Sequence, residues 1–204
     1  NMVECADDSF SALYLGDSKR RLEGELKREF PRATIAEDGN GLGRWVEAVV
    51  EYLRGKLPTL DLPLDVQATA FERRVWEELR RIPYGATRTY TEIARAIGKP
   101  RAVRAVARAC AMNPASIVIP CHRVVRSDGQ LAGYRWGLNR KRVLLEKEKA
   151  ANRYHLPSAR APTTDWWVLS GSITSSGTRA SASWRWASAT RTAAGMVMAL
   201  RCSS

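Results

Sequence analysis

The sequence predicts an α+β protein in two parts: a small N-terminal subdomain of strands and helices, then a mainly helical subdomain with a helix-turn-helix. Three observations support this fold class. Short apolar runs typical of strands alternate with amphipathic helical patterns in the first third of the chain. Residues 57–68 contain two prolines and little periodicity, as a linker does. After that linker, two capping-box signatures each open a helix.

The N-terminal subdomain, residues 1–56, is expected to contain two short strands and two helices. The strands are short apolar runs. The first helix should end at Pro31, because proline cannot continue a helix. Gly55 follows the second helix, at a position where glycine is common. The apolar stripes of the two helices are Leu22, Leu26 and Phe30, and Trp45, Val46, Val49, Val50 and Leu53.

The second subdomain, residues 69–150, opens with two capped helices. Thr69 precedes Glu72 by three residues, and Thr89 stands in the same relation to Glu92, which is the spacing of the capping box. A glycine and a proline make a tight turn after the second helix and start a third, so this pair of helices is interpreted as a helix-turn-helix. A last helix is expected to begin at a capping asparagine, the residue at position 139.

The second helix of the helix-turn-helix, predicted over Arg101–Ala111, has three distinct faces. The inward face is Val103, Val106 and Cys110, the basic face is Arg101, Arg104 and Arg108, and the flank between them is Ala102, Ala105 and Ala109. Arginines bind phosphates, and methyl side chains allow a close approach, so this helix can press against a nucleic-acid backbone. The alternative is a solvated basic face without a partner.

The overall charge of the chain also favours a nucleic-acid partner. The chain has 33 Lys and Arg against 21 Asp and Glu, a formal net charge of +12, which favours a polyanionic partner such as nucleic acid over a basic but inert surface. The four cysteines fit neither a zinc pattern nor a disulfide framework, so no metal and a reducing, cytoplasmic setting are expected. No apolar run approaches the roughly 18 residues of a membrane span, so a membrane is not expected as a partner.

The candidate reactive group is Cys121, which follows Pro120 and precedes His122. Proline stops regular pairing and presents the next residues in a set geometry. A thiol is a strong nucleophile only as thiolate, and a neighbouring histidine or a helix N-terminus lowers its pKa. The alternative is a buried structural cysteine beside a surface histidine.

The last 54 residues, 151–204, have a different composition. They hold 16 Ser and Thr, four of the seven Trp and six Arg, but no Lys or Glu, whereas the earlier chain is rich in both. They also show no sustained helical or strand period. This low-periodicity tail is therefore expected to be disordered or non-native, and dispensable.

Residues from about 64 to 150 resemble the O6-methylguanine-DNA methyltransferases, and most of all the bacterial adaptive-response members of that family. The motifs that carry the resemblance are Thr69-Ala70-Phe71 with Val75-Trp76, Ile82-Pro83-Tyr84-Gly85, Arg101-Ala102-Val103-Arg104-Ala105-Val106, Asn113-Pro114, Ile119 to Val125, and Gly133-Tyr134-Arg135-Trp136-Gly137. Residues 9–58 resemble the family's N-terminal domain more loosely. The resemblance implies a ribonuclease H-like N-terminal domain, truncated at its start, and a winged-helix-like alkyltransferase domain.

The resemblance also implies a reaction. Cys121 takes the alkyl group from O6 of guanine, and from O4 of thymine, in duplex DNA, and the protein is spent after one turnover without a cofactor. The expected partner is double-stranded DNA containing O6-alkylguanine, bound by a monomer. The implied reaction residues are Cys121 as nucleophile, His122 as base through a water, Glu148 as the acid that orients it, Asn113 as brace and Tyr134 as donor to O6. The implied DNA contacts are Arg104, Tyr90, Arg101, Ala102, Ala105, Arg108 and Arg123, and the implied pocket residues are Val124, Ser116, Tyr134, Arg135 and Trp136.

Three other function classes compete with this interpretation. A non-catalytic lesion-binding relative has tryptophan at the nucleophile position, where this chain has Cys121. A transcriptional regulator needs a dimer interface or an effector domain, and neither is visible in the sequence. A cysteine hydrolase needs a histidine distant in sequence and an oxyanion hole, and does not explain the arginine helix.

Overall fold

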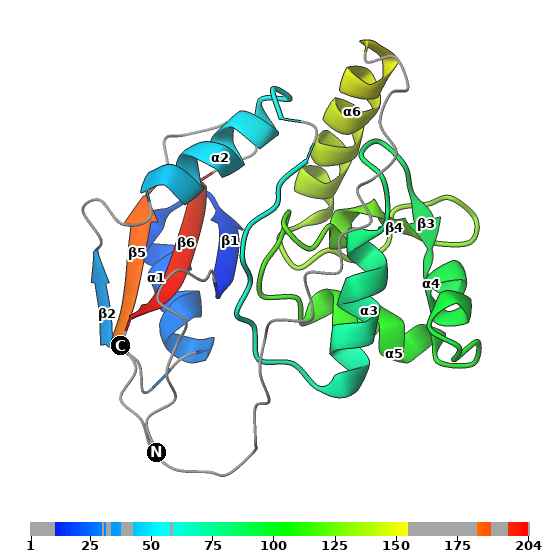
Figure 1. Ribbon diagram of the computed structural model, residues 1–204, viewed down its shortest axis with the longest axis horizontal. Coiled ribbons are helices and arrows are strands. Elements are labelled where there is room, and N and C mark those ends of the chain that lie inside the picture. Colours follow the sequence, from blue (N-terminus) through cyan, green and yellow to red (C-terminus); the bar gives the residue numbers. More distant parts are fainter. Residues whose placement is uncertain are drawn as a thin grey trace.

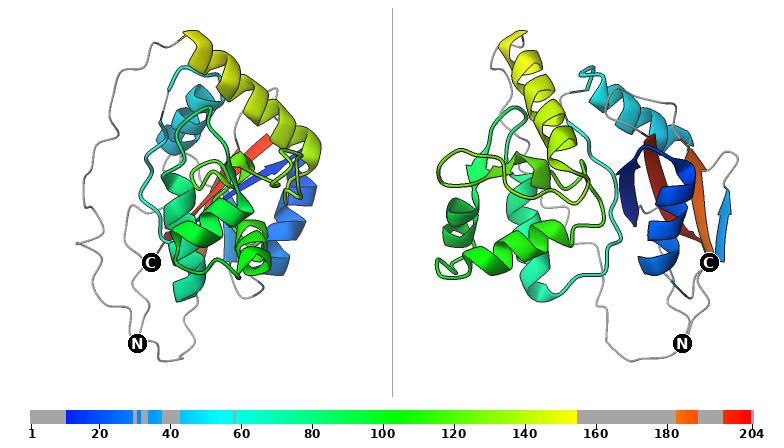
Figure 2. Two further views of the ribbon diagram at one scale, coloured as in Figure 1. Left: turned by 90° about the vertical axis from the view of Figure 1, so that its right-hand side faces the viewer. Right: turned by 180° about the vertical axis from the view of Figure 1, so that it is seen from behind.

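The computed structural model describes residues 11–29, 31, 34–37, 43–57, 59–154, 183–188 and 196–203. These residues form two parts that lie side by side (Figure 1), and Figure 2 shows the same division from two further directions. We call them the sheet half, which combines described segments from the first 53 residues with described segments after residue 182, and the helical half, which is continuous from residue 70 to residue 154.

The sheet half is a four-stranded sheet in the order β1-β6-β5-β2, with helix α1 against β1 and helix α2 against β6. Its elements are β1 (Ala12–Gly16), α1 (Lys19–Glu29), β2 (Thr34–Glu37), α2 (Gly43–Leu53), β5 (Ser183–Ser188) and β6 (Met196–Ser203). The two strands and two helices predicted in the N-terminal subdomain are confirmed. Gly55, just past α2, has φ 77, a left-handed conformation that glycine adopts without a steric cost.

Strands β5 and β6 differ from the expectation of a tail without regular structure. β6 pairs antiparallel with β1, from Ala12 opposite Leu200 to Gly16 opposite Met196, and β5 joins β6 to β2. The hydrogen bonds of a sheet come from the backbone, so distant partners can hold a strand whose own sequence signal is weak. Trp184-Arg185-Trp186 does alternate with a period of two, but over too few residues to predict a strand alone. The other predictions for the tail concern residues outside the described part of the chain, except that the last helix extends to residue 154.

The helical half contains most of the predicted features. Its elements are α3 (Ala70–Arg80), β3 (Arg88–Thr89), α4 (Tyr90–Ala96), α5 (Val103–Ala111), η1 (Cys121–Arg123), β4 (Val124–Val125) and α6 (Leu138–Tyr154). Both capping boxes are confirmed: Thr69 and Thr89 accept from the N–H groups of Glu72 and Glu92, whose carboxylates accept from the threonine N–H groups. Helices α4 and α5 pack on each other and on α3, in the order predicted for a helix-turn-helix.

Two helix starts differ from the predictions. Helix α5 begins at Val103 rather than Arg101, because the Ala102 N–H donates to the Lys99 carbonyl (2.8 Å) and closes a separate turn first. Helix α6 begins at Leu138, so Asn139 lies inside its first turn and does not cap it. None of the described helices is long and apolar enough to span a bilayer.

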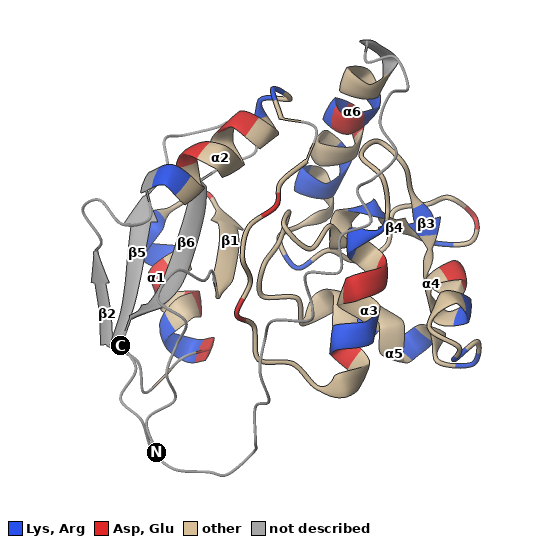
Figure 3. Cartoon of the chain, in the orientation of Figure 1, with Lys and Arg blue, Asp and Glu red and all other residues tan. Residues whose placement is uncertain are grey.

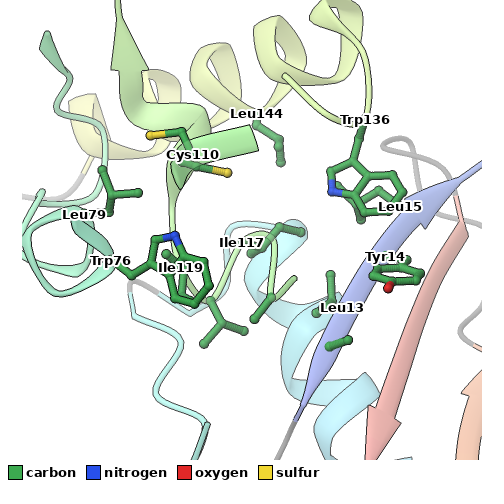
Figure 4. Close-up of a cluster of buried hydrophobic side chains, with 14 of the residues drawn as sticks. Leu13, Tyr14, Leu15, Trp76, Leu79, Cys110, Ile117, Ile119, Trp136 and Leu144 are labelled. Carbon is green, nitrogen blue, oxygen red and sulfur yellow. The ribbon is translucent and has the colours of Figure 1, made fainter. Parts of the chain in front are cut away.

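One hydrophobic core joins the two halves, and Figure 4 shows its centre. Every residue of β1 is buried. The edge of β1 that does not pair with β6 contacts the helical half. There the Leu13 N–H donates to the Pro114 carbonyl (2.9 Å), and Leu13 forms a bridge with Ala115. Leu13, Tyr14 and Leu15 lie in the same cluster as Ile117, Ile119 and Trp136. Strand β1 is therefore shared by the sheet and by the segment that leads to Cys121.

Candidate active site

The reactive turn, which we define as residues 119–125, is held in place by Asn113. The side-chain amide of Asn113 donates to the Ile119 carbonyl (2.8 Å) and to Cys121 Sγ (3.1 Å), while its oxygen accepts from the Ala115 N–H (3.0 Å). Asn113 and Cys121 are both buried, with relative exposures of 1% and 3%. Asn113 thus lies where the predicted brace should lie, and it also donates a hydrogen bond directly to Cys121, the candidate nucleophile.

Cys121 and His122 are both neutral in the resting site. Burial raises the pKa of the Cys121 thiol, although the Asn113 hydrogen bond and the Lys141 charge act to lower it. Burial lowers the pKa of His122, against the opposing effect of Glu148. Desolvation therefore outweighs the groups that act to lower the thiol pKa, and His122, which was expected to lower it, is not one of those groups. A thiol beside a neutral imidazole is a poised pair, because the imidazole can accept the proton when the reaction begins.

The His122 imidazole is oriented by Glu148, as predicted. His122 Nε2 lies 2.7 Å from Glu148 Oε1, and its Nδ1 is buried with no hydrogen-bond partner among the described residues. Glu148 also accepts from the Tyr52 hydroxyl (2.9 Å) and the Gly85 N–H (3.2 Å). Burial alone would raise the pKa of Glu148, but His122 and Arg123 lower it to about 2, so the carboxylate stays ionised.

Arg123 does not lie where the sequence analysis expected a DNA contact. Its guanidinium is buried, and its Nε and one terminal nitrogen donate to the two oxygens of Glu148 (2.9 and 3.1 Å). It also donates to the Ile82 carbonyl (2.6 Å) and the Tyr52 hydroxyl (2.6 Å). The physical reason is that a buried carboxylate needs a cation, and the planar guanidinium offers two parallel donors to it. Arg123 therefore supports Glu148 from inside the protein.

Tyr134 lies on the loop of residues 133–137, with a buried hydroxyl that has no hydrogen-bond partner of normal geometry among the described residues. Burial raises its pKa well above the usual value, and Cys121 raises it further, so the hydroxyl keeps its proton and remains a donor. The nearby Ser116 hydroxyl, which acts to lower that pKa, accepts a hydrogen bond from Trp136 Nε1. Ser116, Tyr134 and Trp136 therefore gather beside the reactive turn, as the predicted pocket residues should.

Arg135 and Trp136 also connect this loop to the sheet half. Arg135 forms an ion pair with Glu29, and its guanidinium carbon lies 5.1 Å from the Tyr14 ring centre and 4.9 Å from that of Trp136. The Tyr14 and Trp136 rings are 5.0 Å apart, and the Tyr14 hydroxyl donates to Glu29 (2.5 Å). These contacts hold the loop against β1, a role that the sequence analysis did not assign to the two residues.

The exposed face of α5 has the predicted pattern. Arg104, Ala105 and Arg108 are exposed, whereas Val106 and Cys110 point into the core. Arg101 is exposed in the turn before the helix, next to the half-buried Ala102. Figure 3 shows basic residues on α4 and α5, on the side of the helical half away from the sheet. Tyr90 begins α4 and is half-buried, and burial raises its pKa to about 12, so it presents a neutral hydroxyl.

Two buried polar residues at this site were missed in the sequence analysis: Tyr52 on α2 and Lys141 on α6. A signal for Lys141 existed. It lies on one helix face with Leu144, Leu145 and Glu148, at spacings of three, four and seven residues, and a lysine in such a buried stripe needs an explanation. Among the described residues no group of three or more His, Cys, Asp or Glu side chains could hold a metal ion.

The chain is similar to several known proteins. Residues 70–150 match the family described as 6-O-methylguanine DNA methyltransferase, DNA binding domain. The chain is 48% identical over 147 residues to the Escherichia coli K12 "Bifunctional transcriptional activator/DNA repair enzyme Ada", covering 72% of this chain but only 42% of that relative. It is 41% identical over 144 residues to the inducible methylated-DNA–protein-cysteine methyltransferase of Bacillus subtilis 168, covering 69% of this chain and 80% of that one. The solved structure of Mycobacterium tuberculosis OGT in complex with DNA is similar with a TM-score of 0.51 and 50% identity, over 52% of this chain and 66% of that one.

Proposed function

The chain belongs to the methylated-DNA–protein-cysteine methyltransferases, and we propose that it repairs DNA by moving an alkyl group from O6 of guanine to its own Cys121. The observation that carries the proposal is the environment of that thiol. It is buried, it accepts a hydrogen bond from Asn113, and it adjoins a histidine that is bonded to a buried glutamate. Such an arrangement suits a nucleophile that reacts once with a substrate brought to it.

The reaction is a displacement at the alkyl carbon. The Cys121 sulfur forms a bond to that carbon as the carbon–O6 bond breaks, and the bonding electrons pass to O6. The thiol proton moves through a water to His122 Nδ1, the ring nitrogen without a hydrogen-bond partner among the described residues, and Glu148 stabilises the imidazolium. The Tyr134 hydroxyl donates towards O6, where negative charge develops. The departing guanine takes up one proton and becomes neutral, which balances the proton released by the thiol. The protein keeps the alkyl group as S-alkylcysteine.

Double-stranded DNA containing O6-alkylguanine is the proposed partner, because the reactive oxygen must leave the base stack to reach a thiol that is only 3% exposed. The exposed arginines of α5 suit phosphate contacts, and Ala102 and Ala105 leave room for a narrow minor groove. Within this proposal Arg104 occupies the place of the flipped base, and Tyr90 crowds the phosphate beside it. We include the same displacement at O4 of thymine, because that oxygen also links an alkyl group to a ring carbon of the base.

The finer description of the fold belongs to the same proposal. We assign residues 1–56 to a ribonuclease H-like domain, 57–68 to a linker, and 69–150 to a winged-helix-like catalytic domain. A sheet with α1 and α2 against it supports the first assignment. The pairing of β3 with β4 beside α3, α4 and α5 supports the last.

The test is transfer of label from duplex DNA that carries O6-[methyl-labelled] guanine. The unaltered protein should become covalently labelled, with no more than one label per molecule, and Cys121→Ser should abolish labelling while leaving DNA affinity nearly unchanged. Cys110→Ser is the matched control, because Cys110 is a free, buried cysteine outside the reactive turn. Label on the Cys121→Ser protein would show that another residue is the nucleophile. Tight binding to alkylated DNA without transfer by the unaltered protein would favour the lesion-binding alternative.

A further inference from the structure

Tyr52, on α2 of the sheet half, is buried against the charged groups that orient His122. Its hydroxyl donates to Glu148 Oε1 (2.9 Å) and accepts from a terminal nitrogen of Arg123 (2.6 Å). Burial raises the pKa of Tyr52, against the opposing charge of Arg123, so the hydroxyl keeps its proton and is donor and acceptor at once. Because Arg123 also donates to Glu148, the three side chains form a closed ring of hydrogen bonds.

The oxygen that Tyr52 contacts is the one that orients His122. Glu148 Oε1 lies 2.7 Å from His122 Nε2, and it accepts from the same terminal nitrogen of Arg123 at 3.1 Å. That nitrogen is closer to the Tyr52 hydroxyl, at 2.6 Å. Without the hydroxyl, Arg123 would pair more fully with both oxygens of Glu148, because two parallel hydrogen bonds are the favoured geometry of a guanidinium and a carboxylate. The carboxylate would then turn away from the imidazole.

The hydroxyl of Tyr52 reaches this carboxylate from the other half of the molecule. Helix α2 packs on β5 and β6, and the Tyr84 ring stands edge-on to the Tyr52 ring with the ring centres 5.6 Å apart. The other hydrogen-bond partners of Glu148 among the described residues belong to the helical half: Gly85, His122 and Arg123. The geometry around His122 therefore depends on a side chain that the sheet half supplies.

We propose that Tyr52 is a positioning residue for alkyl transfer: its hydroxyl holds the Arg123 guanidinium off Glu148 Oε1, so that this oxygen stays directed at His122 Nε2. This inference rests on the proposed function of Cys121, and it extends the set of residues behind that function to the sheet half. No proton passes through Tyr52. His122 receives the thiol proton, Glu148 stabilises the imidazolium, and Tyr52 keeps Glu148 available for that task.

The experiment compares Tyr52→Phe, which keeps the ring and removes the hydroxyl, with Tyr84→Phe. Tyr84 is the matched control, because its ring packs on Tyr52 while its hydroxyl forms no hydrogen bond to the described residues. The first readout is the NMR signal of the His122 Nε2 proton in protein labelled with nitrogen-15 histidine, in a chain that has only two histidines. The second readout is single-turnover transfer at several concentrations of labelled duplex, which separates the rate constant of transfer from DNA affinity.

In Tyr52→Phe the His122 proton signal should move upfield, because its hydrogen bond to Glu148 weakens. Transfer at saturating DNA should slow about tenfold, the loss expected when a hydrogen bond to a charged group is removed, with an unchanged half-saturation concentration. Tyr84→Phe should change neither readout. A His122 signal that stays in place or moves downfield in Tyr52→Phe would overturn the proposal, and so would an unchanged transfer rate.

A double-mutant cycle distinguishes action through Glu148 from a general loss of packing. In a Glu148→Gln background, Tyr52→Phe should slow transfer by less than about twofold, because the carboxylate that it positions is already gone. Equal slowing in the two backgrounds would mean that Tyr52 acts independently of Glu148, which contradicts the proposal.

If Tyr52→Phe fails to fold, the unaltered protein still decides the question. The Tyr52 hydroxyl and the His122 Nε2 proton point at the same oxygen, so both should exchange slowly with water and show a nuclear Overhauser effect to each other. A rapidly exchanging Tyr52 hydroxyl, or no such effect, would overturn the proposal. Where the variant folds, failure of the proposed function looks different: the His122 signal responds to Tyr52→Phe while no label moves from DNA to the unaltered protein.

Discussion

The sheet half and the helical half are assembled in opposite ways. The helical half is one continuous stretch, 70–154, whose helices follow each other with short turns. The sheet half joins β1 and β2 from the start of the chain to β5 and β6 from its end, in the order β1-β6-β5-β2. Local signals in the sequence therefore predicted the helical half well. The sheet half depends instead on pairing between segments that are far apart in the sequence, such as Ala12 with Leu200 and Thr34 with Ser183.

The two halves are nevertheless not independent, because β1 belongs to both. One of its edges pairs with β6, and its Leu13 N–H bonds to Pro114, the residue after the Asn113 brace. A change in the tail therefore has a short route to the nucleophile: from β6 to β1, to Pro114, to Asn113 and to Cys121. If the halves are coupled in this way, changes in the sheet half should alter transfer as well as stability.

The largest effect is expected from truncation after Tyr154, which removes β5 and β6. From its sequence alone the tail is expected to be dispensable, whereas the pairing of β6 with β1 favours the opposite outcome. Loss of the β1–β6 ladder should lower the free energy of unfolding by roughly 5 kcal/mol, at about 1 kcal/mol for each hydrogen bond lost, and slow single-turnover transfer. Chemical denaturation and transfer rate measure both. Hydrogen exchange should increase in β1 before α3 to α5.

A truncated protein with an unchanged denaturation midpoint and an unchanged transfer rate would break the comparison, because the sheet would then not need its C-terminal strands. A lower denaturation midpoint with an unchanged transfer rate would show that the sheet half stabilises the protein but does not influence transfer by the helical half. The control is a chain of the same length in which residues 183–203 are replaced by a glycine- and serine-rich segment, which should behave as the truncation does.

The next largest effect is expected from Glu148→Gln, which leaves the buried Arg123 without its counter-charge. The pKa of Glu148 is about 2 in the folded protein against an ordinary 4.5, so its stabilising contribution is fully present above pH 4.5 and is lost as the pH falls towards 2. This difference corresponds to about 3 kcal/mol at neutral pH. Urea denaturation at pH 7 should show the loss. Between pH 4.5 and 2 the variant should lose less further stability than the unaltered protein; a parallel decline in both would contradict the assignment.

A smaller effect, confined to activity, is expected from Arg104→Ala on the exposed face of α5. Repair of duplex DNA should slow about tenfold, equivalent to about 1.4 kcal/mol, because the arginine helps to hold the flipped base out of the stack. Reaction with free O6-benzylguanine should change by less than about twofold, since that base needs no flipping. Equal losses on the two substrates would indicate that Arg104 acts through the structure of the helical half instead.

The smallest effect is expected at the contact between the halves. A double-mutant cycle of Glu29→Gln with Arg135→Gln should give a coupling free energy of about 0.5 kcal/mol, because the paired side chains are 28% and 25% exposed and partly screened by water. The control cycle pairs Glu25→Gln with Arg21→Gln, an ion pair inside α1. Only the first cycle should show coupling in transfer rate as well as in stability. If the cycle of Glu29 and Arg135 showed no coupling in the transfer rate, Arg135 would not connect the two halves functionally.

The sequence by itself determined most of the helical half. Thr69 with Glu72, and Thr89 with Glu92, predicted two helix starts, because a capping box acts within four residues. Pro120, Cys121 and His122 predicted the reactive turn for the same reason, because they follow one another directly in the sequence. The bracing role of Asn113 was implied by the family resemblance, and the structure places its side-chain amide 3.1 Å from Cys121 Sγ. Short-range geometry of this kind can be read from spacing alone.

Only the tertiary structure decided which charges are buried and which strands are paired. The sequence implied a DNA contact for Arg123 and singled out no role for Lys141, whereas the fold places Arg123 against Glu148 and Lys141 against the Val124 carbonyl. Tyr52 reaches Glu148 across 96 positions of sequence. Whether a charge faces water depends on what packs over it, and a strand depends on the backbone beside it. Neither the burial of a charge nor the pairing of a strand is a property of the local sequence. Both are decided only when distant segments of the chain come together in the fold.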